Sequence, residues 1–284
     1  MSGGNTLGII AGGGELPRAI AEAATADGRD VYVLAIDGIA DAEWIKSYPH
    51  VVAALGEVGR ALRLVKEAGC ASVTFAGRVP RPNFSSLKLD ARGAMALPRL
   101  IAAAAKGDDA LLRAVLAIFE NEGIKVIGSA DAAKALLASE GVLTLRQPSD
   151  RERDDVAAAF KIVRAVGALD VGQSAVVCEG LPLAVEAAEG TDAMLQRVAT
   201  LPVTLRGTLE AKRGVIAKAP KPKQERRVDL PVIGLRTVRL AAEAGLAGIA
   251  VEAGATLLLS PRGVVEAADA AGLFVFGIAK DAGI

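Results

Sequence analysis

Charged side chains and prolines are concentrated in residues 217–234 of a chain that is otherwise rich in alanine, leucine, valine and glycine. Pro220, Pro222 and Pro231 exclude a helix or a central strand there, which predicts a stiff, extended loop. Cations on such a loop suit the oxygens of a phosphate group. Carboxylates beside them suit a hard metal ion or an activated water, as needed where a phosphate ester is broken. The candidate residues of this loop are Lys218, Lys221, Lys223, Gln224, Glu225, Arg227 and Asp229.

A solvated basic linker has a similar composition. We favour a binding site because disordered linkers rarely continue straight into an apolar segment such as VDLPVIG and a helical pattern after it. Catalytic roles are predicted for Lys218, Lys221, Glu225, Arg227 and Asp229.

A glycine turn follows the first apolar run of the chain, in the stretch AGGGELP. Its glycines let backbone amides approach an anion at the start of the next helix, so Gly12, Gly13, Gly14 and Glu15 are candidate contacts for a phosphate or a nucleotide. Gly12 and Gly14 match the first two positions of a dinucleotide fingerprint, but Pro17 occupies the third. A purely structural turn explains these residues equally well, and the sequence leaves both interpretations open.

A second loop, GRVPRPNF at residues 77–84, follows another buried apolar run. Arg78 and Arg81 lie there beside prolines that stiffen the backbone, and a guanidinium group held in this way can grip phosphate oxygens through two hydrogen bonds. Gly77, Arg78 and Arg81 are therefore candidate substrate contacts. An exposed loop whose arginines face water is the alternative.

Three carboxylates lie close together in the stretch LAVEAAEGTDAML. Glu186, Glu189 and Asp192 surround the end of a predicted strand and the start of a predicted helix, and their oxygens suit Mg²⁺, which binds through a few carboxylates and substrate phosphates. Together with Glu225 they form the predicted metal set, and Thr191 is a candidate substrate contact. Alternatively, Thr191 or Asp192 is only a helix cap.

These groups must be positioned by the strands and helices that short apolar runs and helical spacing predict. The first half alternates strands with helices, which predicts a doubly wound parallel sheet in a Rossmann-like α/β domain. Ligands of such sheets bind outside the carboxyl ends of the strands, where both loops are expected. The second half is predicted as an α+β domain. Because 284 residues exceed one ordinary domain, two domains are expected, at residues 1–132 and 133–284.

The apolar runs give definite strand positions. In the first half, strands are predicted at residues 7–10, 31–36, 51–52, 73–76 and 125–127. In the second half, they are predicted at residues 174–178, 183–187, 214–219, 249–252, 257–259 and 273–276. In the motif GDDALL, Asp108 or Asp109 is expected to be a helix cap and first-turn acid rather than a metal ligand.

Composition excludes several classes of protein. Lysine plus arginine equals aspartate plus glutamate at 33 each, and aromatic residues make up only 3% of the chain, which argues against a nucleic-acid binder. His50 is the only histidine, so zinc binding and histidine-based catalysis lack partners. Cys70 and Cys178 lie far apart in apolar surroundings, which indicates buried thiols in a reducing compartment. No signal peptide or spanning segment is recognised, so the expected location is the cytoplasm.

Several motifs taken together resemble a known family. The motifs LGIIAGGGELP, GRVPRP, GDDALL, LAVEAAEGTDAML and KPKQERRVDLPVIGLRTV follow one another from residue 7 to residue 238. In this order they resemble the LpxI-type UDP-2,3-diacylglucosamine pyrophosphatases of lipid A biosynthesis. The resemblance covers nearly the full chain, and the last two motifs make it specific.

The resemblance implies a fold, a reaction and a location. The fold is a Rossmann-like amino-terminal domain and a second domain of unusual fold, with the ligand in the cleft between them. The reaction is Mg²⁺-dependent hydrolysis of UDP-2,3-diacylglucosamine to UMP and 2,3-diacylglucosamine 1-phosphate, with water attacking the β phosphorus. The protein is expected to be a homodimer in peripheral contact with the cytoplasmic face of the inner membrane through its lipid substrate.

The candidate residues then acquire roles. Mg²⁺ is expected to bridge the diphosphate and the carboxylates, while the lysines and Arg227 offset charge on the phosphoryl oxygens. The expected substrate contacts are Gly12, Gly13, Gly14, Glu15, Gly77, Arg78, Arg81, Thr191, Lys223 and Gln224.

Glu225 departs from the family, in which the residue after the glutamine of KPxQ is usually aspartate. The extra methylene moves the carboxylate outward by about one carbon–carbon bond, which near-octahedral Mg²⁺ or a closely placed base tolerates poorly. A catalytically impaired protein that binds a nucleotide or a lipid is therefore one alternative. The other is an NAD(P)-dependent oxidoreductase, suggested by the βαβ start and by Asp37 after the second strand.

Overall fold

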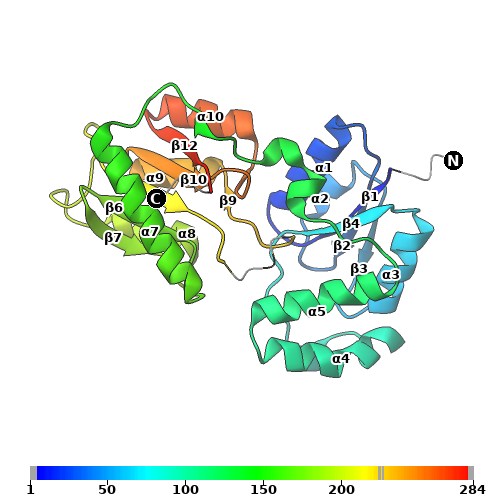
Figure 1. The fold of residues 1–284 in the computed structure, drawn as a ribbon. Coiled ribbons are helices and arrows are strands. Elements are labelled where there is room, and N and C mark those ends of the chain that lie inside the picture. Colours follow the sequence, from blue (N-terminus) through cyan, green and yellow to red (C-terminus); the bar gives the residue numbers. More distant parts are fainter. Residues whose placement is uncertain (1–4, 223–224, 226, 281–284) are drawn as a thin grey trace. The chain divides into compact units, whose positions relative to one another are not determined.

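The computed structural model describes residues 5–222, 225 and 227–280, and the chain divides into two compact units (Figure 1). The first unit comprises Met1–Lys134 and Glu225–Val228, and the second comprises Ala135–Gln224 and Asp229–Ile284. The sequence assigns Glu225 to the second domain, and the structure corrects this, because the segment 225–228 makes its contacts with the first unit. Two predicted substrate contacts, Lys223 and Gln224, lie outside the described residues.

A parallel sheet in the order β3-β2-β1-β4 forms the centre of the first unit (Figure 1). Its central strand β1 and the neighbouring β2 are largely apolar and buried, as expected for strands covered on both faces, whereas the edge strand β3 is buried only at Ala53. The predicted strand at residues 125–127 is reduced to a single parallel bridge, between Val126 and Val73. The strand bounds are β1 Leu7–Ala11, β2 Val31–Ile36, β3 His50–Ala53 and β4 Ser72–Ala76.

Helices cover this sheet with apolar residues at helical spacing. Helix α1 buries Ile20 and Ala24, and α5 buries Leu116 and Phe119. Each large side chain buried in this way stabilises the unit by about 1.5–3 kcal/mol. The helix bounds are α1 Leu16–Ala26, α2 Ala42–Ile45, α3 Val58–Glu67, α4 Ala91–Ala104, α5 Asp108–Asn121 and α6 Ser129–Ala132.

The second unit has a mixed sheet in the order β5-β12-β10-β8-β6-β7. Strands β12, β10 and β8 are parallel at its centre, whereas β5 and the β6–β7 hairpin pair antiparallel at the two sides. Strands β9 and β11 form a small parallel pair beside it. The bounds are β5 Gly141–Val142, β6 Ser174–Cys178, β7 Leu181–Val185, β8 Val215–Lys218, β9 Val232–Ile233, β10 Gly248–Glu252, β11 Leu257–Leu258 and β12 Phe274–Ile278.

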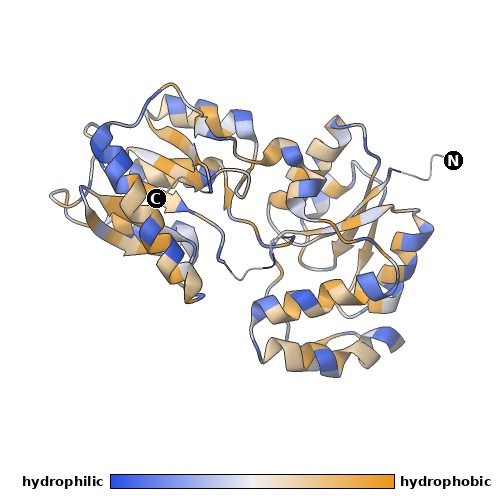
Figure 2. Cartoon of the chain, viewed as in Figure 1, coloured by the Kyte–Doolittle hydropathy of each residue, from blue (hydrophilic) through white to orange (hydrophobic). Residues whose placement is uncertain are grey.

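Two layers of helices enclose this mixed sheet. One face packs against α7 through Val156 and Phe160, and the other packs against the remaining three helices through residues such as Met194 and Val264. Figure 2 shows polar residues along the outer side of α7, whose first turn is fixed by a Ser149 capping box. The helix bounds are α7 Asp150–Ala168, α8 Gly190–Ala199, α9 Leu235–Glu243 and α10 Pro261–Ala270.

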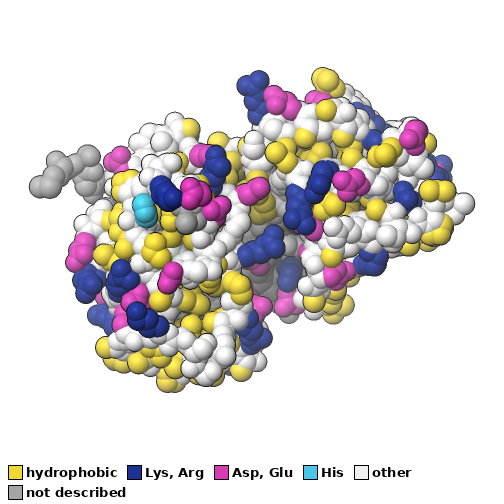
Figure 3. All heavy atoms as spheres, turned by 180° about the vertical axis from the view of Figure 1, so that it is seen from behind, with side chains coloured by type: hydrophobic (Ala, Val, Ile, Leu, Met, Phe, Trp, Pro, Cys, Tyr) yellow, Lys and Arg dark blue, Asp and Glu magenta, His cyan; other side chains and the backbone are white. Residues whose placement is uncertain are grey.

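Two further features are the distribution of charge on the surface and the length and apolarity of the helices. Basic and acidic side chains are interspersed on the face seen in Figure 3, as expected from a formal net charge of zero. Within residues 5–222, 225 and 227–280, no helix combines the length and apolarity needed to cross a bilayer.

Candidate functional site

The glycine turn and the second loop, predicted separately, meet at the carboxyl edge of the first sheet. Strands β1 and β4 are neighbours, so the loops that follow them lie side by side. The Gly13 N–H donates to the Arg78 carbonyl and the Arg78 N–H donates to the Gly13 carbonyl, each at 2.9 Å. This is the point where the strand order reverses, which is where open α/β sheets bind ligands.

Two of the glycines are needed for this close approach. A Cβ atom on Gly12 would lie 2.7 Å from the Arg78 carbonyl oxygen. Gly77 has a φ of +91°, and a Cβ atom there would lie 2.7 Å from the Gly13 carbonyl oxygen. The structural interpretation of these two glycines is therefore supported, whereas Gly14 faces open space and is exposed to a ligand.

The two arginines of the second loop differ in whether their guanidinium groups already have hydrogen-bond partners. Arg81 donates from Nη2 to the Ala104 carbonyl at 2.6 Å, and so satisfies the carboxyl end of α4. Arg78 is exposed, and no hydrogen bond or ion pair of its guanidinium is found within the described ranges. Arg78 is therefore the guanidinium of this loop that can receive an anion without breaking an existing contact.

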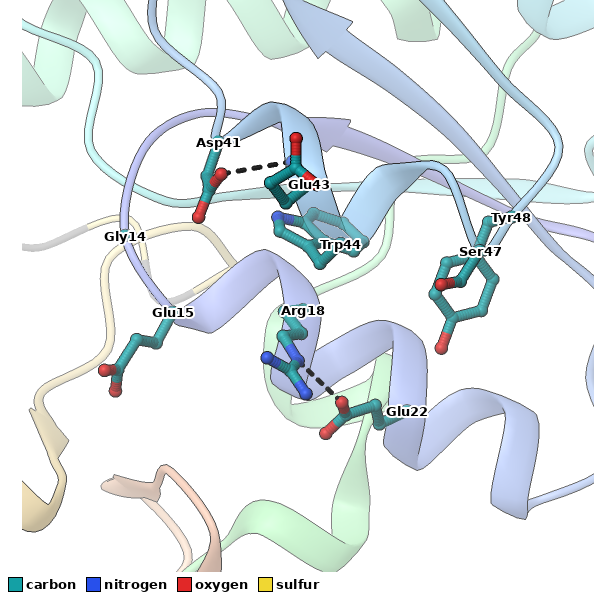
Figure 4. A pocket seen from close by; sticks show the side chains of 9 residues that line it. All are labelled: Gly14, Glu15, Arg18, Glu22, Asp41, Glu43, Trp44, Ser47 and Tyr48. Carbon is teal, nitrogen blue, oxygen red and sulfur yellow. Dashed lines mark hydrogen bonds and ion pairs between the residues drawn. The ribbon is translucent and has the colours of Figure 1, made fainter.

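A pocket of about 560 Å³ opens beside the glycine turn, between α1 and α2 (Figure 4). Trp44 and Tyr48 form an edge-to-face pair in it, with ring centroids 6.0 Å apart. Its acidic side chains outnumber its one cation, Arg18, which is paired with Glu22 at 2.7 Å. The lining suits hydroxyl groups and a flat ring better than a phosphate. The lining residues are Gly14, Glu15, Arg18, Glu22, Asp41, Glu43, Trp44, Ser47 and Tyr48.

The second unit gathers a buried polar group, here called the Lys218 cluster: Lys218, Ser174, Glu186 and Thr191. Lys218 ends β8, and its strand partner is Ser174 at the start of β6. Glu186 follows β7, and its N–H donates to the Ser174 carbonyl at 2.9 Å. Thr191 lies in the first turn of α8. The sheet thus brings together three predicted site residues and one, Ser174, that sequence reasoning missed.

Side-chain hydrogen bonds connect the Lys218 cluster. The Lys218 ammonium donates to Thr191 Oγ1 at 2.8 Å, and the Ser174 hydroxyl donates to the Glu186 carboxylate. The two hydroxyl oxygens lie 3.4 Å apart. Lys218 is 6% exposed and Glu186 is 7% exposed, so each charge depends on the other groups of the cluster to offset its lost hydration.

Two other predicted metal ligands are paired with arginines. Glu189 contacts Arg197 at 3.0 Å, and Asp192 contacts Arg236 at 2.7 Å. Hydrogen bonds from its own backbone N–H and from Arg197 lower the pKa of Glu189. Among the residues that the structure describes, no three acidic, histidine or cysteine side chains form a group able to hold a metal ion. The expected cluster of Glu186, Glu189 and Asp192 is therefore not formed.

Glu252 is a buried carboxylate that sequence reasoning missed. It ends β10, the strand next to β8, and is 6% exposed. Its Oε1 atom is buried and has no hydrogen-bond partner among the described residues. An acidic residue ending an apolar strand was the available signal, since carboxyl ends of parallel strands carry ligand-binding groups.

The segment 225–228 is held by α5 and α6 of the first unit. Glu225 binds Arg227 through both carboxylate oxygens, at 3.0 and 3.1 Å, and its backbone N–H donates to Asp109 at 2.8 Å. The hydrogen bond from Arg227 lowers the pKa of Glu225. Asp108 and Asp109 are acids of the first turn of α5, as predicted, but the cap itself is Gly107. Asp109 also anchors the backbone of Glu225.

Lys221 and Asp229 are the remaining candidate residues of the loop after β8. Lys221 pairs with Asp170 at 2.8 Å. Asp229 is exposed, and within the described part of the chain no hydrogen bond or ion pair of its carboxylate is found.

Fold and site together define a class. The protein has two α/β units, one Rossmann-like, and each gathers polar and charged groups at the carboxyl edge of parallel strands, as in proteins that bind anionic nucleotide-like ligands. Family models of the LpxI N-terminal domain and the LpxI C-terminal domain match residues 6–136 and 139–276. The chain belongs to the LpxI family.

Other known proteins give one strong and two weak likenesses. The UDP-2,3-diacylglucosamine pyrophosphatase LpxI of Caulobacter vibrioides is 50% identical over 272 residues, which cover 96% of this chain and 97% of that protein. N5-carboxyaminoimidazole synthase of Aspergillus clavatus, solved with ADP and 5-aminoimidazole ribonucleotide, matches 66% of this chain and 42% of its own at 16% identity and a TM-score of 0.25. Isoflavone reductase matches 98% and 80% at 12% identity and a TM-score of 0.30. The two weak likenesses carry no argument about fold or function.

Proposed function

We propose that this protein hydrolyses the pyrophosphate bond of UDP-2,3-diacylglucosamine, a step of lipid A biosynthesis. The products are UMP and 2,3-diacylglucosamine 1-phosphate, and water attacks the β phosphorus. The observation that carries the proposal is 50% identity over nearly the whole length of a pyrophosphatase with this substrate. The gathering of charged groups at strand ends supports it, because a diphosphate needs cations and hydrogen-bond donors around it.

The first unit is assigned the nucleotide end of the substrate. Gly14 and the N-cap Glu15 precede α1, at the end of the helix where backbone N–H groups and the helix dipole favour a phosphate. Arg78 lies next to them and is exposed. The adjoining pocket offers carboxylates for the ribose hydroxyl groups and the Trp44–Tyr48 pair as a wall for the base.

The second unit is assigned the phosphoryl group on the sugar side. Lys218 places a cation at a sheet edge, and Thr191 orients its ammonium group. A buried cation stabilises charge on a phosphoryl oxygen far more strongly than an exposed one, because water does not screen it. Lys221, Asp229 and Lys223 are assigned to the same end.

A carboxylate must also hold the attacking water. Glu225 is 15% exposed at its side chain, and its lowered pKa keeps it ionised at neutral pH. An ionised carboxylate accepts a hydrogen bond from water and orients it toward phosphorus. Glu225 is assigned this role.

Mg²⁺ is proposed as the cofactor. When bound, it would draw charge from the phosphoryl oxygens. Because Mg²⁺ binds through one or two carboxylates together with substrate phosphates, a cluster of three protein ligands is not required. The unpartnered Oε1 atom of buried Glu252 fits such a ligand, whereas Glu189 and Asp192 are already neutralised by arginines.

The protein is also proposed to lie at the cytoplasmic face of the inner membrane, in peripheral contact through the acyl chains of its substrate. It is proposed to be a homodimer. Light scattering of the purified protein would measure the dimer, and sedimentation with vesicles that contain the substrate would measure membrane contact.

Hydrolysis in H₂¹⁸O tests the proposed function. The purified protein, Mg²⁺ and UDP-2,3-diacylglucosamine are expected to release UMP, with ¹⁸O in the diacylglucosamine 1-phosphate. Label in UMP would contradict attack at the β phosphorus. Tight binding of the substrate without release of UMP would identify a binding protein instead, and the reaction would then be rejected.

A further inference from the structure

Arg227 is occupied by two carboxylates. Its Nε and Nη2 atoms donate to Glu225 at 3.0 and 3.1 Å, and its Nη1 atom donates to Glu120 at 2.5 Å. All three nitrogen atoms therefore have a carboxylate partner. Glu120 lies in the last turn of α5, a rigid helix of the first unit.

The backbone of the same segment is also fixed. The Glu225 N–H donates to Asp109 at 2.8 Å, and Asp109 is itself paired with Arg113. The Ser129 N–H at the start of α6 donates to the Arg227 carbonyl at 3.0 Å. The segment 225–228 is thus attached to both ends of α5 and to α6.

The charge around Arg227 does not favour an incoming phosphate. Two carboxylates share one guanidinium, so Glu225, Arg227 and Glu120 together carry one negative charge. An anion would have to displace a carboxylate that already binds the guanidinium fork with good geometry. Arg78, by contrast, is exposed and makes no such pairs with described residues.

We propose that Arg227 is a positioning residue for Glu225, and that Glu120 and Asp109 complete its support. Glu120 holds the guanidinium, the guanidinium orients the Glu225 carboxylate, and Asp109 fixes the Glu225 backbone. This assignment rests on the proposed hydrolysis, in which Glu225 orients the attacking water. Arg227 then contributes to catalysis through Glu225 and does not itself bind phosphate.

The two possible roles of Arg227 predict opposite effects of one substitution. If Arg227 bound phosphate, Glu120→Gln would free the cation and lower KM. If Arg227 positions Glu225, the same change loosens the support and lowers kcat while KM stays nearly constant. A misplaced catalytic group typically lowers the rate by roughly 100-fold for a shift of about 1 Å.

The experiment compares four variants in UMP release. We expect Glu120→Gln and Arg227→Lys to lower kcat at least tenfold with KM unchanged within twofold, because lysine keeps the charge but cannot bind two carboxylates as a fork. Glu120→Asp should recover part of kcat. Glu122→Gln is the matched control, since Glu122 ends the same helix and pairs only with Lys66 and Arg92 among described residues. It should retain the wild-type kcat.

A second measurement does not depend on activity. Hydrogen exchange of the Glu225 amide should become faster in Glu120→Gln and Arg227→Lys than in wild type and Glu122→Gln. A lower KM in Glu120→Gln, or full activity in Arg227→Lys, would overturn the positioning role. If wild type released no UMP, the proposed function would fail, and unchanged exchange in the variants would separately refute the support of Glu225 by Glu120.

Discussion

The Lys218 cluster and the Glu225–Arg227–Glu120 group use charge in different ways. In the Lys218 cluster, every member is buried, and hydroxyl groups connect the cation to the carboxylate. In the second group, the side chains of Arg227 and Glu120 are 35% and 42% exposed, that of Glu225 is 15% exposed, and the charges contact one another directly. Buried charges depend on each neighbour for lost hydration, whereas exposed pairs are screened by water and salt.

Charges in the buried cluster are therefore expected mainly to affect the stability of the fold, and charges in the exposed group mainly to fix the position of a side chain. Removing a member of the buried cluster leaves another charge without hydration. Removing a member of the exposed group mainly lets a side chain move. The contrast implies effects of decreasing size on stability.

Lys218→Met should have the largest effect. It removes the buried cation of a hydrogen-bonded cluster that also holds the buried Glu186 carboxylate, and an uncompensated buried charge destabilises a protein by about 3–5 kcal/mol. Arg227→Met, the matching change in the exposed group, should lose about 1 kcal/mol or less per pair. Denaturant unfolding measures both. Equal losses would remove the contrast.

Ser174→Ala should have an intermediate effect. The hydroxyl that donates to Glu186 is lost in a site without room for bulk water, and an unsatisfied buried group destabilises by about 1–3 kcal/mol. Ser86→Ala is the control, because Ser86 is exposed and its hydroxyl donates only to a nearby loop carbonyl among described groups. Thermal melts of the two variants give the comparison. A change at Ser86 as large as at Ser174 would contradict it.

Rising salt should change the stability contributed by the exposed group but not that contributed by the Lys218 cluster, and this effect should be smaller than those of the substitutions above. The Debye length is about 10 Å at 0.1 M salt and about 3 Å at 1 M, so exposed pairs weaken as salt rises. The stability difference between wild type and Glu120→Gln should shrink across this range, whereas the Lys218→Met difference should stay constant. Urea unfolding at several salt concentrations measures both. If the stability difference for Glu120→Gln did not change with salt, the Glu120–Arg227 pair would behave like a buried pair.

The pH dependence of the Glu225 pair should be the smallest effect. The hydrogen bond from Arg227 lowers the pKa of Glu225 below its ordinary value of 4.5. A lowered folded-state pKa gives stability that is present above the unfolded pKa and is lost as pH falls through the folded one. The stability difference between wild type and Glu225→Gln should therefore shrink as pH falls below about 4.5. A difference that is constant down to pH 2 would show that Glu225 is not held by charge.

Local pattern predicted most of the elements. The predicted strands at residues 31–36 and 174–178 match β2 and β6 residue for residue, because apolar runs bounded by turn residues have little choice of conformation. The strand at residues 125–127 is shorter than predicted, since only Val126 pairs with β4. The phosphate-binding role of the two loops, inferred from glycine, proline and arginine, stays a prediction.

Hydrogen-bond and ion-pair partners that are distant in sequence could not be predicted from local patterns. Ser174 is one polar residue at the start of an apolar strand, and no sequence signal distinguishes it until β6 pairs with β8. The acidic groups at residues 186–192 are adjacent in sequence, yet Arg197 and Arg236 neutralise two of them. Glu225 follows a loop of the second unit but is anchored by Asp109 of the first.

Residues close together along the chain were sufficient to predict most strands and the family of the protein, because apolar runs and motifs are local patterns. Packing decided which charges find partners that are distant along the chain. Strand order brings Arg78 to the glycine turn and Ser174 to Lys218, and helix α5 brings Glu120 to Arg227. Many of these pairs join groups that are distant in sequence, such as Arg227 and Glu120, so they form only when the sheets and helices have packed.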